Sequence, residues 1–446
     1  MKRNIGFTTI QLLVLGFVFI TLIGAFLLMQ PFSISGSEKI SFIDAFFTAT
    51  SAITTTGLIV VDTGSFFSRF GQAVILILFQ VGGLGYMIFI ALLMVGLGKR
   101  LSFGNVDLLH ESIARPSSED LLKFSKKIVI FTIFFEAIGI ALLTCYWRKF
   151  FSLPDAIYTG IFHSISAFCT AGFSLYPDSF TIYRDSIFFN GSIILLCFAG
   201  SAGFFVLNDI YHFGKQIVHK KYPRRFSAHT KLAVLIMAFL VMAGIIIMYF
   251  APGQTIAAQA KERALHSVFQ IVSASTTTGF NTVNIGTLTN PLLWLIILLM
   301  FIGGCPGGTA GGIKTTTFGL IILSARSVLT GRKNVNVFHR SAPQGMIIRA
   351  YSIAVIAMVW IAAAMGILLV TDKGLSFQSI LFEITSAFGT VGLSTGVTSS
   401  LSVGGRIVII FTMLLGRLGP IAVGYSLIGK PRQVNFIYPE AEILVG

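Results

Sequence analysis

The sequence has few charged residues. Only 11% of its 446 residues are Asp, Glu, Lys or Arg, whereas an average soluble domain has about 25%, and 54% are hydrophobic. This composition excludes an ordinary soluble domain and predicts an integral membrane protein.

Cysteine is also scarce, and the motifs of catalysis are missing. The four cysteines stand singly in apolar surroundings, without the paired spacing of zinc or redox sites, so we interpret them as small packing residues. The sequence has no Ser/His/Asp set, paired carboxylates or metal-ligand spacing at a plausible membrane depth. We therefore expect no enzyme, no catalytic residue and no cofactor.

Acidic residues are outnumbered, with 17 Asp and Glu against 32 Lys and Arg, giving a net charge of +15. Most basic residues lie in the N-terminal stub, in the linkers between apolar units and near the C-terminus, as in Lys220–Arg225 and Arg332–Arg340. The positive-inside rule then predicts a multi-pass protein of the cell membrane with both termini in the cytoplasm. A nucleic-acid partner is not needed to explain the charge.

The sequence does contain one short motif in four copies. These are Thr54-Thr55-Thr56-Gly57-Leu58, Cys169-Thr170-Ala171-Gly172-Phe173, Thr276-Thr277-Thr278-Gly279-Phe280 and Gly389-Thr390-Val391-Gly392-Leu393. Successive motif glycines are 115, 107 and 113 residues apart, which is too long a period for a solenoid repeat. The period indicates four duplicated membrane units in one polypeptide.

Each copy follows a short, mostly apolar segment rich in Phe, Ser and Ala. The segments are Ser41–Ile53, Leu153–Phe168, Ala258–Ser275 and Leu375–Phe388. All are shorter than the roughly 20 apolar residues that cross a bilayer, so we expect re-entrant helices with an extended Thr-x-Gly return. Non-helical backbone at membrane depth survives only inside protein or beside a water-filled path.

Four such returns around an axis can form a cation filter. Glycine permits the backbone angles that turn successive carbonyls toward one axis, and carbonyl rings replace the hydration shell of potassium in channels. Only K⁺ at filter carbonyls is expected as a bound metal. The predicted ion-binding residues are Thr55, Thr56, Gly57, Thr170, Ala171, Gly172, Thr277, Thr278, Gly279, Thr390, Val391 and Gly392.

The resulting fold prediction is an all-α integral membrane protein. It has four repeats of membrane helix, pore helix and membrane helix (M1–pore helix–M2), hence eight spans, with fourfold pseudosymmetry around a central ion pore. The repeats are residues 1–100, 101–222, 223–340 and 341–430, followed by a cytoplasmic tail, 431–446. The spans are Phe7–Met29, Phe70–Leu97, Lys127–Trp147, Ser186–Phe213, Lys231–Phe250, Pro291–Leu323, Met346–Thr371 and Gly405–Ile428.

Glycine clusters recur midway along the second span of each repeat. Gly82–Gly85 and Gly200–Gly203 are interpreted as close helix packing by small residues. The third copy swells into Gly303–Gly312 with Pro306, which cannot continue a helix and predicts a flexible constriction below the filter. The predicted gate residues are Gly303, Gly304, Gly307, Gly308, Gly311, Gly312, Lys314 and Arg417.

Arg417 is a charge within an otherwise apolar span, which is a functional hypothesis by default. It is expected near the gate loop, where it raises the barrier to a cation or braces the loop by donating to its carbonyls. Lys314, which ends the loop, either acts similarly or is a solvated residue at the cavity wall.

With these motifs the chain resembles the Trk/Ktr/HKT superfamily of potassium transporters, most closely its KtrB-type membrane subunits. The likeness covers essentially the whole chain, and the single span before Ser41 favours the Ktr branch over Trk members with extra N-terminal spans. The resemblance implies potassium uptake, a gate loop in the third unit, a homodimer, and a cytosolic nucleotide-binding ring (KtrA-like) as regulatory partner. Sodium is a candidate activator, and membrane lipid is the surrounding partner.

Another class stays open at this stage, a secondary transporter of another cation with a midplane binding site. Such a protein needs broken helices, and Gly303–Gly312 supplies one. The basic linkers argue against it, because they orient all four units the same way up rather than as inverted repeats.

Overall fold

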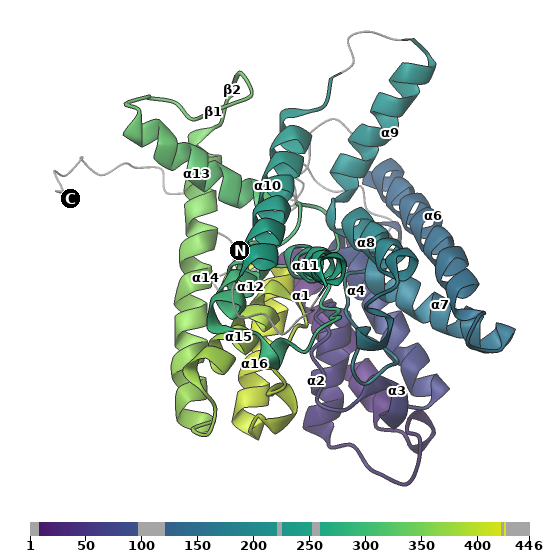
Figure 1. Ribbon diagram of the computed structural model, residues 1–446. Helices are drawn as coiled ribbons and strands as arrows, with labels where there is room; N and C mark the ends of the chain where they lie inside the picture. Colours follow the sequence, from purple (N-terminus) through teal and green to yellow (C-terminus); the bar gives the residue numbers. More distant parts are fainter. Residues whose placement is uncertain (1–8, 97–120, 221–224, 252–258, 421–422, 425–446) are drawn as a thin grey trace, which may run out of the picture.

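The computed structural model describes residues 9–96, 121–220, 225–251, 259–420 and 423–424, and these are mostly helical (Figure 1). The predicted tail 431–446 lies outside the described residues. So do most of the linker 98–121 and the middle of the basic segment Lys220–Arg225.

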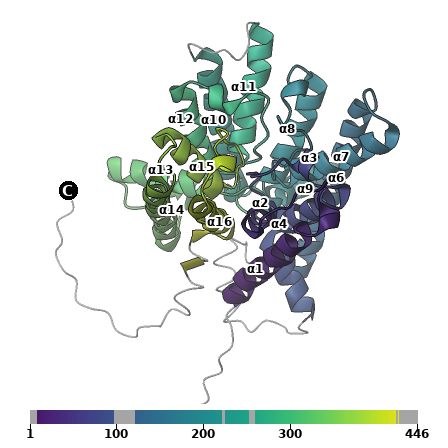
Figure 2. The same ribbon diagram turned by 90° about the horizontal axis from the view of Figure 1, so that it is seen from below.

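The helices form four groups around a common centre, as the view from below shows (Figure 2). In each group a helix that ends in a Thr-x-Gly turn lies between an earlier and a later helix. The first group is α1 (Thr9–Leu28), α2 (Phe42–Ile53) and α4 (Arg69–Gly96); the second is α6 (Leu121–Trp147), α7 (Leu153–Phe168), α8 (Ile187–Ser201) and α9 (Phe204–Val218); the third is α10 (Ala228–Phe250), α11 (Ala260–Ser275), α12 (Asn290–Phe301) and α13 (Thr315–Leu329); the fourth is α14 (Gln344–Thr371), α15 (Phe377–Gly389) and α16 (Val403–Leu418).

The remaining elements are short. They are α3 (Thr63–Phe66), four 3₁₀ turns and a two-residue hairpin of β1 (Asn336–Val337) and β2 (Arg340–Ser341), paired antiparallel. The 3₁₀ turns are Pro31–Ser33, Thr181–Tyr183, Ile285–Thr287 and Thr398–Ser400. The described chain is mostly helical, as predicted, and the hairpin is confined to a surface loop between α13 and α14.

The four short helices match their predicted segments within two residues at each end. Three of them begin at a serine whose hydroxyl accepts a backbone N–H of the first turn: Ser41, Ser152 and Ser376. Such caps satisfy donors that the first helical turn leaves open. Each of the four helices ends where the Thr-x-Gly segment takes over the last backbone hydrogen bonds, and in the three capped helices the sequence therefore sets both ends.

Three described helices are long and apolar enough to cross a membrane: residues Phe124–Trp147 of α6, and α10 and α14. Only 22–33% of their most apolar windows is buried within the protein. Large apolar side chains point outward, including Ile133, Phe239 and Val359, each more than 60% exposed. Apolar faces of this extent suit lipid rather than water, so the chain is a membrane protein.

The predicted second span of the second repeat, Ser186–Phe213, is wrong as a single helix. It consists of α8 and α9, which meet at a 99° bend. Gly203 at the bend has φ +86°, and the Phe204 N–H donates to the Gly307 carbonyl at 3.0 Å instead of continuing the helix. The prediction of close packing therefore fits Gly200. At Gly203 the helix breaks instead, because the N–H of the next residue, Phe204, bonds to the third repeat.

The last two second spans are also interrupted. In the third repeat, residues 302–314 separate α12 from α13, as expected for the Gly-rich stretch. The predicted Gly405–Ile428 is not one helix, because α16 ends at Leu418 and Gly419 takes φ +86°. If α8 and α9 count as one broken span, four described spans meet the length and composition criteria, and the eight-span count stays a prediction.

Candidate functional site

The four Thr-x-Gly segments share one backbone conformation. The first threonine of each has a φ of about +50°, a left-handed value that β-branched residues rarely adopt, and the glycine has a φ between +70° and +92°. Such strain persists only where the surroundings over-determine it. The threonines are Thr55, Thr170, Thr277 and Thr390, and the glycines are Gly57, Gly172, Gly279 and Gly392.

In every repeat the middle residue of the segment donates its N–H back to the preceding short helix. The acceptor is the carbonyl of a serine five residues earlier, at 2.8 to 2.9 Å. The pairs are Thr56 with Ser51, Ala171 with Ser166, Thr278 with Ser273, and Val391 with Ser386. Because these N–H groups point away from the centre, the segments can present carbonyl oxygens on their other side.

The four segments close into a ring. A Cβ placed on Gly57 would overlap the Ala171 carbonyl oxygen, and one on Gly172 would overlap that of Thr278. In the same way Gly279 abuts Val391, and Gly392 abuts Thr56, which returns the series to the first repeat. Only glycine combines this conformation with such close approach. Ring closure therefore brings together all twelve residues predicted as one site.

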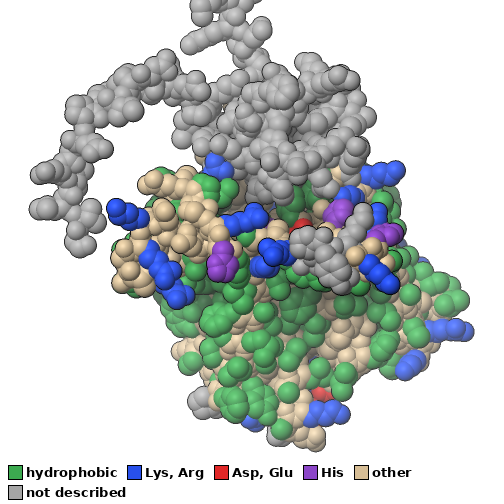
Figure 3. Space-filling model, turned by 90° about the horizontal axis from the view of Figure 1, so that it is seen from above, with side chains coloured by type: hydrophobic (Ala, Val, Ile, Leu, Met, Phe, Trp, Pro, Cys, Tyr) green, Lys and Arg blue, Asp and Glu red, His purple; other side chains and the backbone are tan. Residues whose placement is uncertain are grey.

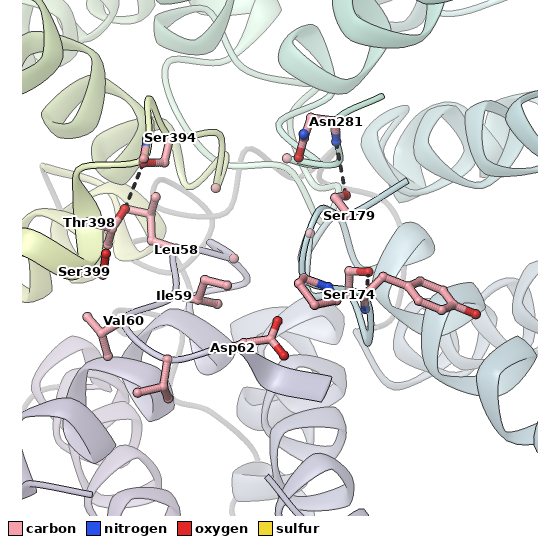
Figure 4. A pocket seen from close by; sticks show the side chains of 18 residues that line it. Leu58, Ile59, Val60, Asp62, Ser174, Ser179, Asn281, Ser394, Thr398 and Ser399 are labelled. Carbon is pink, nitrogen blue, oxygen red and sulfur yellow. Dashed lines mark hydrogen bonds between the residues drawn. The ribbon is translucent and has the colours of Figure 1, made fainter. Parts of the chain in front are cut away.

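A cavity of about 340 Å³ lies against the ring, lined by all four motif glycines. Side chains of the four repeats surround it, with Ser394 and Thr398 on one side and Ser179 and Asn281 on another (Figure 4). Asp62 is the one charged residue among the 18 that line it. A single carboxylate in a concave polar mouth favours cations over anions.

Polar side chains behind the ring hold it in place, and the sequence interpretation missed most of them. The Ser166 and Ser273 hydroxyls donate to the carbonyls of Phe173 and Phe280 at 2.8 and 2.6 Å, and the Ser386 hydroxyl accepts the Gly392 N–H at 3.1 Å. A serine six residues before each motif glycine was the available signal.

Two further braces lie nine residues before the motif glycines. His163 Nε2 accepts the Leu175 N–H at 3.2 Å, and its Nδ1 lies 2.9 Å from the Thr159 carbonyl. The fully buried Glu383 accepts hydrogen bonds from the hydroxyls of Ser394, at 2.9 Å, and Thr398. His163 thus satisfies neighbouring polar groups. Among the residues that the structure describes, no group of three or more His, Cys, Asp or Glu side chains could hold a metal ion.

The Gly-rich loop, residues 302–314, folds back on itself and against α8. The Gly303 N–H donates to the Ile313 carbonyl at 2.8 Å, which brings the two ends of the loop together. The Cys305 and Thr309 N–H groups donate to the carbonyls of Ser201 and Gly200 at 2.9 and 3.1 Å. The backbone of this irregular segment is thereby hydrogen-bonded to the broken region of the second repeat.

Two basic side chains contact the loop. Arg417 donates to the carbonyls of Thr309 and Gly82, so it joins the loop to α4. Lys314 donates to the Ala310 carbonyl and lies 3.4 Å from that of Gly311. Both side chains therefore satisfy loop carbonyls that the loop's own backbone leaves open.

Ion pairs join neighbouring repeats at the start of the short helices. Arg406 pairs with Asp44, both about 80% buried, whereas Arg69 pairs with Asp155 at 2.7 Å on the surface. Hydrogen bonds from Ser152 and from Arg69 lower the pKa of Asp155 below its usual value. The capping residues of these helices are the serines Ser41 and Ser152, and the aspartates pair with arginines of neighbouring repeats.

The fold and the ring together define a helical membrane protein built around four converging backbone segments. Residues 8–429 match the TrkH family of cation transport proteins, and the chain belongs to this family. It is 36% identical to the Ktr system potassium uptake protein B of Bacillus subtilis, covering 99% of this chain and 98% of that protein. It is also 32% identical to the potassium/sodium uptake protein NtpJ of Enterococcus hirae, covering 100% and 99%.

A solved structure shows the same fold. The potassium transporter TrkH from Vibrio parahaemolyticus superimposes with a TM-score of 0.74, covering 96% of this chain and 86% of the other. At 20% sequence identity this likeness concerns the arrangement of helices alone.

Proposed function

We propose that this protein takes up potassium across the cell membrane through the four-segment ring. The observation that carries the proposal is the closure of the ring, in which each motif glycine packs on a carbonyl of the next repeat. Carbonyl oxygens held at fixed spacing can replace the hydration shell of a cation of matching size. The names of the full-length relatives support potassium as that cation.

The proposed ion ligands are the carbonyls of Thr55–Gly57, Thr170–Gly172, Thr277–Gly279 and Thr390–Gly392. The four copies are not equal, because Cys169 and Gly389 stand where the other copies have Thr54 and Thr276. Fewer complete oxygen rings follow than in a true tetramer, so we expect looser discrimination against sodium. The relative named as a potassium/sodium uptake protein is in line with a role for sodium.

We propose that the loop 302–314 is the gate, and the proposal rests on the loop and on the two basic side chains that contact it. The loop lies beneath the ring in contact with it, and Arg417 and Lys314 donate to its carbonyls. A flexible Gly-rich segment can leave such a position when those bonds are given up. A positive side chain beside the path also raises the barrier to a cation.

A cytosolic nucleotide-binding ring is the proposed regulator. Seen from the end that carries α9 and the β hairpin, Lys and Arg side chains gather over the face while Asp and Glu are sparse (Figure 3). The exposed basic residues at this end include Lys215 on α9, Lys220 just after it, Arg326 on α13, Arg332 and Lys333 between α13 and β1, and Arg340 on β2. This face is the proposed docking surface, and both α9 and α13 connect it to the loop.

Potassium flux into reconstituted vesicles, with sodium as competitor, tests the function. We expect potassium uptake that sodium inhibits weakly, since the ring favours the larger ion. Uptake that saturates equally for both ions would contradict a potassium filter. Coupling of each potassium to a second ion, with a single saturable midplane site, would instead indicate a secondary transporter.

The dimer proposal concerns the C-terminal tail, which lies outside the described residues. It ends in Ile443-Leu444-Val445, and an apolar tail in the cytosol needs a partner surface. Deleting Glu440–Gly446 should weaken the homodimer, as measured by crosslinking and native mass. An intact dimer after the deletion would assign the tail another role.

A further inference from the structure

The Gly-rich loop touches the ring itself, and not only the helices around it. Thr309 Oγ1 lies 3.1 Å from Thr170 Oγ1 and donates to the Phe168 carbonyl at 3.1 Å. The Gly311 N–H donates to Thr277 Oγ1 at 3.0 Å. Gly311 also packs so close to Thr390 that a Cβ would overlap its hydroxyl.

Three of the four threonines that begin the Thr-x-Gly segments are therefore in contact with residues 309–311. The hydroxyl of the fourth, Thr55, donates to the carbonyl of Thr54 at 2.7 Å. The cavity is lined by the four motif glycines and by none of these threonines, so the hydroxyls face the other end of the ring, where an ion leaving the proposed filter would pass. The contact is thus between the candidate gate and the innermost oxygens of the candidate filter.

Thr309 joins the loop to the ring, to α8 and to Arg417. It is fully buried, its N–H donates to the Gly200 carbonyl, and its own carbonyl accepts from Arg417. Its hydroxyl is the only side-chain group among residues 309–311 that can hydrogen-bond, because its neighbours are Ala310 and Gly311. Removing that hydroxyl would separate the loop from Thr170 while leaving the backbone bonds to α8 and Arg417 in place.

We propose that Thr309 couples the loop to the filter, so that loop closure and cation binding at the innermost filter position oppose each other. The inference deepens the proposed function and rests on the filter assignment. When the loop is closed, the Thr277 hydroxyl accepts the Gly311 N–H and has one lone pair less for an ion. The positively charged side chains of Arg417 and Lys314 also lie close by. By thermodynamic linkage, a closed loop lowers cation affinity and a bound cation favours loop release by the same factor.

Thr309→Val tests the coupling, because valine keeps the shape and removes the hydroxyl. One net hydrogen bond is worth a factor of about five in an equilibrium, so potassium affinity should rise about fivefold. Isothermal calorimetry on the purified full-length chain measures the affinity, with sodium titrated separately. Thr309→Ser should keep the wild-type affinity, since it restores the hydroxyl.

Thr315→Val is the matched control, a buried threonine at the first position of α13 whose N–H bonds the Gly304 carbonyl. It makes the same chemical change at the far end of the loop and should leave potassium affinity unchanged. Equal potassium affinity in wild type and Thr309→Val overturns the coupling. So does an equal rise in Thr309→Val and Thr315→Val, since that would mean general loosening of the loop.

A measurement without any substitution protects the test against a variant that fails to fold. Hydrogen–deuterium exchange of wild-type peptides covering residues 303–315 is compared in potassium and in choline. Potassium should speed exchange there while slowing it in the four Thr-x-Gly segments. Equal or slower exchange of the loop in potassium overturns the proposal.

The two proposals fail in different ways. Absence of potassium-selective binding in the wild type removes the filter assignment, and the coupling with it. Selective binding that neither Thr309→Val nor loop exchange responds to removes the coupling alone.

Discussion

The two ends of the four repeats behave differently. At the ring, the threonine φ angles span only 48° to 54°, and every copy makes the same contact with the next. At the inner end, α4 runs through its glycines unbroken, α8 and α9 bend by 99°, a loop separates α12 from α13, and α16 stops at Leu418. The four copies therefore share one structure at the ring and differ from one another in the helices that follow it.

Packing explains the difference. The glycines Gly82, Gly200 and Gly416 each lie against the carbonyl of a residue in the last turn of the short helix of their own repeat. Gly303, their counterpart in the third repeat, presses on Gly311 of the loop instead. Every segment of the closed ring supports the next, so all four must keep the same conformation, whereas the proposed gate needs only one movable segment.

Breaking the ring should have the largest effect. Gly279→Ser forces a side chain into a φ of +87° and into the Val391 carbonyl. We expect a loss of potassium preference over sodium of about tenfold or more, or no uptake, since strain of this kind is of order 1–3 kcal/mol before the overlap is added. Flux in vesicles measures it, with Gly366→Ser as control, because a Cβ there meets no described atom within 4 Å. Unchanged selectivity would remove the filter assignment.

Breaking the inner end should raise flux rather than abolish it. Deleting Gly307–Gly311 would remove the proposed constriction, so potassium flux should increase and lose its dependence on the proposed cytosolic regulator. Arg417→Ala should act in the same direction but less, because it removes bonds to Thr309 and Gly82 and leaves the loop in place. Flux is compared with and without the regulator, and a deletion variant with ordinary, regulated flux would put the gate elsewhere.

Two glycines of the same conformation separate backbone strain from contact with the loop. Gly203 and Gly419 both have φ +86° and ψ 139°, but a Cβ on Gly203 would lie 2.5 Å from the Pro306 carbonyl oxygen. Around Gly419 no described atom lies within 4 Å of such a Cβ. Gly203→Ala should therefore destabilise the fold by roughly 2 kcal/mol more than Gly419→Ala. Melting temperatures measured side by side would show equal losses if the loop gives way freely.

The smallest effect is expected at the ion pairs between repeats. Asp44→Asn should lower thermal stability more than Asp155→Asn, because the Asp44–Arg406 pair is mostly buried and the Arg69–Asp155 pair is exposed to solvent screening. The lowered pKa of Asp155 means that its contribution is present at neutral pH and is lost as pH falls below about 4. If Asp155→Asn lowered the thermal stability more than Asp44→Asn, burial would not determine which ion pair contributes more to stability.

Much of the site was readable from the sequence because it depends on local rules. A Thr-x-Gly after a short helix of 12 to 16 residues predicts a turn of one kind, and four copies predict four equivalent turns. The same reading missed Ser166, Ser273 and Glu383, whose partners are fixed only once the segment folds back on its helix. It also read Ser186–Phe213 as one span, since nothing within that segment announces the bend at Gly203.

The sequence by itself determined the membrane class, the four Thr-x-Gly copies, the short helices before them and the irregular loop, because hydropathy, period and glycine content act within one segment. Only the tertiary structure decided that the four glycines close a ring, that α8 bends where Gly307 takes the Phe204 N–H, and that Thr309 and Arg417 meet under that ring. Those outcomes are contacts between residues more than 100 positions apart. Their geometry depends on how whole repeats pack, which no single segment of the sequence encodes.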